Sequence, residues 1–193
     1  MKPTSIALLA APVLFAVYGV VRLIGRSDGH YGPGLDWQAA HLSFLAGLVL
    51  LGVGLAGMVR QLPATGPRRL WTALASIGLV TSVVQIGVDI VAGLLATDHA
   101  NLSEITGRFT HLPGAEPVFY QAGPPLLYIG LTALSVLLAR RGRMAWWNPV
   151  LIGVGSILPM ASLNLLPLSG ALLLAGLAPL ALRKTEAGAA AAV

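Results

Sequence analysis

The feature that most constrains this chain is a series of long apolar stretches, with the charged residues gathered between them. A helix needs about 20 mainly apolar residues to cross the hydrocarbon core of a membrane. Four stretches reach that length, at about 5–24, 38–59, 71–95 and 120–139. Only 10% of the residues are charged, which is too few to cover an ordinary water-facing surface. The sequence therefore predicts an integral membrane protein.

The last apolar stretch is longer than one span. It runs from about 148 to 182 and is interrupted by "NLLPLSG". Because Pro and Gly punctuate helices, we expect two short spans, about 148–166 and 168–182, that turn near Pro167, Ser169 and Gly170. The predicted fold class is an all-α integral membrane protein, a bundle of six transmembrane helices.

The six spans form one expected polytopic membrane domain over residues 1–184. The remaining segment, "TEAGAAAAV" at 185–193, is of low complexity, and we expect it to be disordered. At the other end of the chain, the apolar run from Ser5 to Val21 is longer than the roughly 7–15 residues of a signal-peptide core. This favours an uncleaved first span over a signal peptide.

The distribution of Lys and Arg predicts the orientation of the bundle. These residues mark the cytoplasmic side when they lie in short loops. Three fall on one side, Arg22, Arg26 and Arg108, whereas the other side holds Lys2, Arg60, Arg68, Arg69, Arg140, Arg141, Arg143, Arg183 and Lys184. This asymmetry places both termini in the cytoplasm of a multi-pass protein of the cell membrane. Trp37 and Tyr120 then fall at the outer interface, where aromatic side chains form a belt.

The outer side also carries the longest expected loop, residues 96–119. Connections of this length are often functional or disordered. Leu102, Ile105 and Phe109 are spaced so that they could share one face of a short helix lying on the membrane.

One apolar span, "LVTSVVQIGVDIVAGLL" at 79–95, contains a carboxylate, Asp89. On a helix with about 100° per residue, its small and polar residues share one face, whose members are Ala75, Gly78, Thr81, Ser82, Gln85, Asp89, Ala92 and Gly93. Bulky aliphatic residues cover the rest. We therefore expect the small and polar face to pack against other helices and the bulky face to meet lipid.

Other spans place polar residues at the same depth as Asp89, in the outer half of the expected membrane. They are His41 in the second span, Gln121 in the fourth, and Asn164 in the fifth. Tyr128 shares the face of the fourth span that holds Gln121. We predict an outward-opening polar pocket with Asp89 and His41 as the catalytic acid–base residues, and with ligand-binding residues Gln85, Gln121, Tyr128 and Asn164.

Asp89 has two interpretations. An ionisable residue inside a membrane span is by default a candidate functional residue, because an ionised carboxylate there costs about 2.5–3.5 kcal/mol on insertion scales. Alternatively, Asp89 is neutral, is hydrogen-bonded to His41, Gln85 or Tyr128, and only holds helices together. The sequence leaves both interpretations open.

Several classes of site are disfavoured by what the chain lacks. It has no Cys, which excludes disulfides, thiolate metal sites and a cysteine nucleophile. Only His41 lies in a span, so a haem held between helices is not expected, and the outer His, Asp and Glu residues match no tight metal-ligand spacing. No cofactor and no metal are therefore predicted. The net charge of +5 does not indicate a nucleic-acid partner, because the basic residues border apolar spans.

Three functions fit these patterns, and we favour the first. It is the binding of a lipid-like or isoprenoid-like small molecule, with Asp89 as proton donor or acceptor. The second is a small proton-coupled transporter, which would need polar residues on both sides of Asp89 and, with so few spans, a homodimer. The third is a non-catalytic membrane subunit or scaffold. Expected partners are membrane lipids and a hydrophobic ligand.

Overall fold

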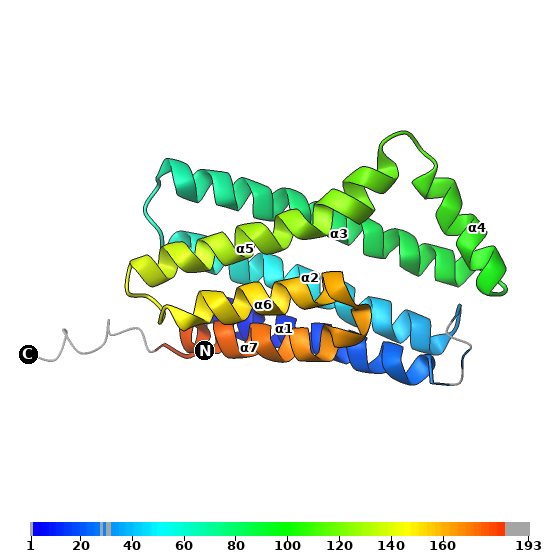
Figure 1. Cartoon of the computed structure of the whole chain (residues 1–193), viewed down its shortest axis with the longest axis horizontal. Coiled ribbons are helices and arrows are strands. Elements are labelled where there is room, and N and C mark those ends of the chain that lie inside the picture. Colours follow the sequence, from blue (N-terminus) through cyan, green and yellow to red (C-terminus); the bar gives the residue numbers. More distant parts are fainter. Residues whose placement is uncertain (1, 28, 30–31, 184–193) are drawn as a thin grey trace, which may run out of the picture.

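The computed structural model describes residues 2–27, 29 and 32–183, and this part of the chain contains helices and no strands. The helical elements follow one another along the chain as α1 (Pro3–Gly25), α2 (Leu35–Arg60), α3 (Gly66–Leu95), α4 (His99–Thr110), the π-helix η1 (Glu116–Ala122), α5 (Gly123–Arg140), α6 (Trp147–Ala161), the 3₁₀ turn η2 (Leu163–Leu165) and α7 (Leu166–Leu182) (Figure 1). Lys184 and the tail predicted at 185–193 lie outside the described residues.

Five helical segments are long and apolar enough to span a membrane: α1, α2, α3, η1 with α5, and η2 with α7. The prediction of an all-helical bundle is confirmed, and these five segments are consistent with the predicted membrane spans. α6 has only 15 residues, or about 22 Å, which is less than the hydrocarbon thickness of about 30 Å. The sixth crossing and the cytoplasmic position of the termini stay predictions.

The six longer α-helices form a closed ring. α1 packs against α2 and α7, α3 packs against α2 and α5, and α6 closes the ring between α5 and α7. Large apolar side chains fill its centre, among them Phe15, Leu48, Leu51, Leu131 and Leu134, each at most 1% exposed. The first residues of α1 and the last residues of α7 lie at one end of the ring, and α4 lies at the other (Figure 1).

The predicted inner face of α3 is confirmed. Gly78, Thr81 and Ser82 are buried together with Ala75, Ala92 and Gly93, and Gln85 and Asp89 are half-buried. Val80 and Leu94, on the opposite face, are 61% and 69% exposed. Gly78 lies against the backbone of Gly123 and Leu127 on α5, so that a Cβ at position 78 would collide with main-chain atoms. Small residues permit this close approach of two helices.

The turn between the last two helices differs from the prediction, which placed it near Pro167 and Gly170. The structure breaks the chain at Ser162, whose extended backbone ends α6, and α7 begins at Leu166. Pro167 lies in the first turn of α7, where the missing N–H leaves no helical hydrogen bond unmade. Consequently, the α6–α7 turn stops short of the α4 end reached by α1, α2 and α3 (Figure 1).

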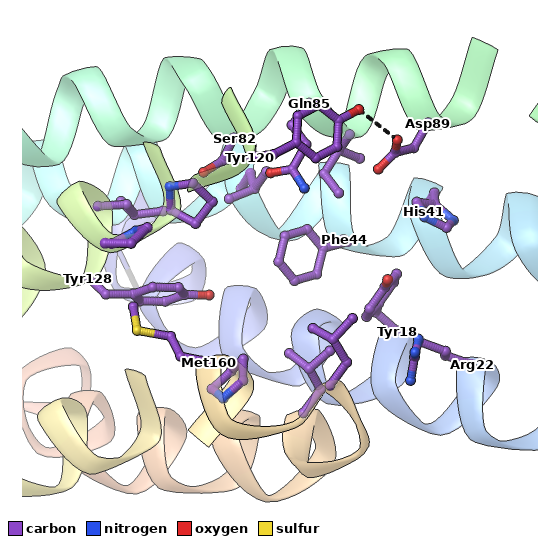
Figure 2. A pocket seen from close by; sticks show the side chains of 18 of the residues that line it. Tyr18, Arg22, His41, Phe44, Ser82, Gln85, Asp89, Tyr120, Tyr128 and Met160 are labelled. Carbon is purple, nitrogen blue, oxygen red and sulfur yellow. Dashed lines mark hydrogen bonds between the residues drawn. The ribbon is translucent and has the colours of Figure 1, made fainter. Parts of the chain in front are cut away.

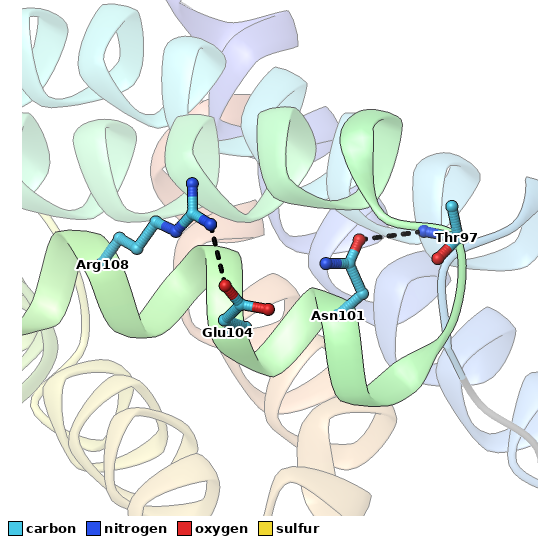
Figure 3. A network of polar contacts seen from close by, with 4 residues as sticks. All are labelled: Thr97, Asn101, Glu104 and Arg108. Carbon is cyan, nitrogen blue, oxygen red and sulfur yellow. Dashed lines mark hydrogen bonds and ion pairs between the residues drawn. The ribbon is translucent and has the colours of Figure 1, made fainter.

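The predicted short helix in the 96–119 connection is confirmed as α4. Asp98 caps it by accepting a hydrogen bond from the Asn101 backbone N–H at 2.9 Å, and Leu102 is buried at 3% exposure. On its solvent side, Arg108 pairs with Glu104 at 2.8 Å (Figure 3). The hydrogen bond from Arg108 lowers the pKa of the Glu104 carboxyl.

Candidate functional site

A cavity of about 760 Å³ lies inside the ring, in the half nearer α4. Side chains from α1, α2, α3, η1, α5, α6 and η2 contribute to its walls. Two local features create the space. α6 ends early, at Ala161, and the π-helix η1 interrupts the regular α-helix before α5. π-Helical turns are rare and are often found at functional sites.

One wall of the cavity is a polar edge on α3. Ser82, Gln85 and Asp89 are separated by three and four residues, which places them on one face of the helix. Figure 2 shows all three side chains on the cavity side of α3. Ser82 and Asp89 are seven positions apart, which corresponds to about 10 Å along the helix. A ligand in the cavity therefore meets hydrogen-bonding groups at three successive depths.

Asp89 is held by Tyr120, which donates its hydroxyl hydrogen to Asp89 Oδ1 over 3.0 Å (Figure 2). This corrects the expectation that His41, Gln85 or Tyr128 would be the partner. Tyr120 was assigned to an interfacial belt, but η1 turns its ring inward. Its ring lies 6.4 Å from that of Phe109 on α4, so the outer helix helps to fix the residue that contacts Asp89.

Helix α2 fixes the backbone around Asp89. Trp37 Nε1 donates to the Asp89 backbone oxygen at 3.0 Å, and Gln38 Nε2 donates to the Ile90 oxygen at 3.1 Å. Gly93, one turn further along α3, lies against Trp37 and Gln38 so closely that a Cβ would clash with both. The position of the Asp89 carboxyl is therefore set by two neighbouring elements, α2 through the backbone and η1 through the side chain.

His41 is buried at 3% exposure and lines the same cavity. Its Nδ1 lies 2.8 Å from the Trp37 backbone oxygen. Because a carbonyl oxygen only accepts hydrogen bonds, Nδ1 carries the hydrogen, and in a neutral ring Nε2 is then the acceptor. The Trp37 ring stacks on the imidazole with 4.2 Å between the ring centroids. The Tyr18 ring is nearly perpendicular to the imidazole, with 5.3 Å between the centroids. The ring is thus held in one orientation with a basic nitrogen available.

The structure brings five of the six predicted site residues to this one cavity, namely Asp89, His41, Gln85, Gln121 and Tyr128. Asn164 is exposed and does not line the cavity. Its Oδ1 instead accepts a hydrogen bond from Arg22 Nη1 at 3.0 Å, which ties η2 to α1. The functional roles of these residues stay predictions.

Sequence reasoning missed Arg22, which was counted as a loop charge. It lies in the last turn of α1, is 8% exposed and lines the cavity. Its spacing of four residues from Tyr18, another lining residue, places both on one face of α1. That spacing was the available signal, and it was overlooked because Arg22 follows the apolar run directly.

Ser82, which the sequence predicts on the inner face of α3 but not as a site residue, also lines the cavity. Most buried Ser and Thr hydroxyls in these helices donate to a carbonyl one turn earlier, as Ser135 does to Leu131 and Ser156 does to Ile152. The Ser82 hydroxyl, on a residue 3% exposed, has no hydrogen-bond partner within the described part of the chain. Buried polar atoms are nearly always paired, so this hydroxyl, which lines the cavity, is a candidate contact for a ligand.

Apolar side chains of α2, α5 and α6 form much of the remaining lining, with Phe44, Leu127 and Met160 among them. Met160 and Leu163 are 53% and 46% exposed, and Gln121 on η1 is also exposed. η1 packs on α3 and α5, whereas η2 packs on α1, α6 and α7. The cavity therefore opens sideways between η1 and η2, on the lateral surface of the bundle.

Toward the other end of the ring the cavity is closed. Leu48 and Leu127 line its base, and Leu51 and Leu131 continue the same faces of α2 and α5 with at most 1% exposure. A smaller cavity of about 320 Å³ near Arg60 and Thr72 shares no lining residue with the first. The two spaces are separated by packed leucines.

Within the described residues, no group of three or more His, Asp or Glu side chains is placed to hold a metal ion. Comparison of the chain with family models, curated proteins and solved structures found no match.

Proposed function

We propose that this protein binds a lipid-like or isoprenoid-like amphiphile in the cavity between α3 and α1, and that Asp89 and His41 exchange protons with it. The observation that carries the proposal is the combination of one polar edge, one apolar wall and a lateral opening in a single cavity of about 760 Å³. An amphiphile matches both walls, and a lateral opening allows it to enter from the membrane.

The polar edge supports the proton-transfer part of the proposal. Asp89 and His41 both line the cavity, and His41 presents Nε2 because Nδ1 is engaged by a backbone carbonyl. A carboxyl group and an imidazole facing one space can act as an acid and a base on the same molecule. Tyr120 orients the carboxyl through its 3.0 Å hydrogen bond.

The closed base of the cavity argues against the transport alternative. A pathway requires polar groups on both sides of the central carboxylate. Instead, leucines of α2 and α5 with at most 1% exposure follow directly below the cavity. The scaffold alternative receives some support from the Tyr120–Asp89 bond, because it joins α3 to η1. Variants of Asp89 separate this alternative from ligand binding.

The proposal includes the orientation expected from the basic residues. Arg60, Arg68 and Arg140 lie on the end of the ring opposite α4, and basic loops mark the cytoplasmic side. The cavity then faces the outer leaflet of the cell membrane. The bound amphiphile would be a lipid of that leaflet or a molecule dissolved in it.

Native mass spectrometry of the gently solubilised protein tests the proposal. The wild type should carry a defined amphiphile, and Asp89→Asn should lose it while keeping its helical circular dichroism and its elution volume. Glu104→Gln is the matched control, because it also removes one carboxylate but lies on the exposed side of α4. A wild type without any amphiphile, or an Asp89→Asn variant that retains it fully, would contradict the proposal.

A further inference from the structure

The cavity carries opposite charges on facing walls. Asp89 projects from α3, and Arg22 projects from α1 (Figure 2). Asp89 is bonded to Tyr120, and Arg22 donates to Asn164, so that each is held on its own wall. Charged side chains inside membrane spans are rare and usually face a functional cavity. A molecule that lies between these walls is therefore in reach of one anionic and one cationic group.

We propose that the bound amphiphile has a zwitterionic head group, with a primary ammonium beside Asp89 and a phosphate beside Arg22. This inference rests on the function proposed above and adds the chemical class of the ligand.

The surroundings of Asp89 favour an ammonium group. Its carboxylate has two oxygens and about four acceptor positions, of which Tyr120 occupies one. The Gln85 side chain, one turn away, offers a further acceptor oxygen. Trp37 and Tyr120 add aromatic rings at the same end of the cavity, and such rings attract cations. A primary ammonium can donate three hydrogen bonds to this set, whereas a quaternary ammonium can donate none.

The surroundings of Arg22 favour a phosphate group. A guanidinium has five N–H donors in a planar fork that matches phosphate oxygens, and Arg22 lines the cavity. Arg26, the residue directly after the end of α1, also lines the cavity, as does His99 from α4. The α1 wall is therefore rich in donors suited to an anion.

The mixture of charges also disfavours simpler head groups. A purely anionic head would lie close to Asp89, and a purely cationic head would lie close to Arg22 and Arg26. Like charges brought together in a site discriminate against the wrong ligand. An ammonium and a phosphate on one head group avoid both repulsions.

Competition between lipids with identical acyl chains tests the inference. The full-length protein in detergent is offered phosphatidylethanolamine, phosphatidylcholine and phosphatidylglycerol together, and the bound species are counted by native mass spectrometry. We expect phosphatidylethanolamine to be retained about tenfold over each of the other two, a difference that corresponds to about 1.4 kcal/mol. Equal retention, or a preference for phosphatidylglycerol, would overturn the inference and leave the proposed function standing. Failure to bind any amphiphile would overturn both.

Two variants test which charged residue contacts the ammonium and which contacts the phosphate. Asp89→Asn should lose most of the bound phosphatidylethanolamine, so that any lipid still retained shows no preference over phosphatidylglycerol, and Arg26→Gln should weaken phosphatidylethanolamine binding several-fold. Arg26 is exposed, so its replacement leaves the fold intact. Arg108→Gln, an equal change of charge on α4, is the control and should change neither. Unaltered selectivity in both cavity variants would overturn the inference.

Soluble phosphoethanolamine distinguishes a lipid from a free head group as the source of this chemistry. If it displaces bound lipid at millimolar concentration, the head group is recognised by itself and the zwitterion inference is supported for a soluble ligand. If only the acylated form competes, the inference is supported for a lipid. Displacement by inorganic phosphate alone, with no contribution from the amine, would overturn it.

Discussion

Helix α3 uses the same face in two different ways along its length. In the half away from α4, Ala75 and Gly78 lie in close contact with α5, and Gly130 of α5 approaches Ala75 just as closely. In the half nearer α4, the same face presents Ser82, Gln85 and Asp89 to a cavity. The period of small and polar residues continues unchanged between the halves. The difference comes from the partner, because η1 and the short α6 leave the second half uncovered.

The residue pattern of α3 determines which face of the helix points inward. The neighbouring elements determine whether that face packs closely or lines a cavity. A helical face of small and polar residues can serve close packing or line a site. In the packed half each substitution changes the contact between two backbones. In the cavity half, a substitution changes what a ligand meets.

The largest effect is expected in the packed half. Gly78→Ala places a methyl group against the Leu127 and Gly123 backbones, which cannot move without separating α3 from α5. Overpacking of this kind costs about 1–3 kcal/mol. We expect a lower midpoint of thermal unfolding, measured in detergent by circular dichroism.

Gly87→Ala on the same helix is the matched control, since a Cβ there meets nothing within 4 Å. It should be neutral or slightly stabilising because Ala favours the helix over Gly. Equal destabilisation by both substitutions would show that helix propensity, and not the α3–α5 contact, is being measured.

The next largest effect on stability is expected for the hydrogen bond between Tyr120 on η1 and Asp89 on α3. Tyr120→Phe removes the hydrogen bond to Asp89 and keeps the ring. Hydrogen bonds between membrane helices contribute about 0.6 kcal/mol on average and up to about 1.7 kcal/mol. We expect a loss of stability in this range, and a larger fractional loss in amphiphile binding if Tyr120 orients Asp89.

A double-mutant cycle with Asp89→Asn isolates the pair, because residues in contact give non-additive effects. Strictly additive changes in the stability of the two single variants and the double variant would mean that Tyr120 and Asp89 act independently.

Much of this arrangement follows from the sequence. The apolar runs predict the long helices, and the period of α3 predicts its inner face, since both depend on residues that are close in sequence. The same periods bring Gln85, His41 and Tyr128 to one cavity. They do so because all three lie at similar depths on faces that avoid lipid.

Other parts could not be predicted, because they depend on contacts between distant segments. The inward turn of Tyr120 requires the π-helix η1, and the hydrogen bond of Asn164 to Arg22 joins residues 142 positions apart. η2, which follows the end of α6 at Ser162, packs on α1. No local pattern in the sequence specifies these contacts.

A smaller effect tests the unpartnered hydroxyl of the cavity half. Ser82→Ala removes a buried polar atom that has no partner in the described part of the chain, so stability should stay the same or rise by less than about 1 kcal/mol. Amphiphile binding should weaken. Ser135→Ala, in which the lost hydroxyl was bonded to Leu131, should leave binding unchanged. A Ser82→Ala variant that binds as well as the wild type would remove Ser82 from the site.

The smallest effect on stability is expected on α4, which belongs to neither half of α3. Arg108 lowers the pKa of Glu104, so the pair favours the folded helix above the ordinary pKa of Glu, and this contribution is lost as the pH falls through the lowered value. Both side chains are well exposed, and exposed pairs of this kind contribute little. Acidification should therefore lower the protection factors of the α4 amides, in which exchange rates are corrected for the intrinsic pH dependence of exchange, and leave the unfolding midpoint of the bundle unchanged. Glu104→Gln should remove the pH dependence in α4. If it instead lowered the midpoint of the whole bundle, α4 would be part of the cooperative core, and the contact of Phe109 with Tyr120 would be the route by which it stabilises the cavity.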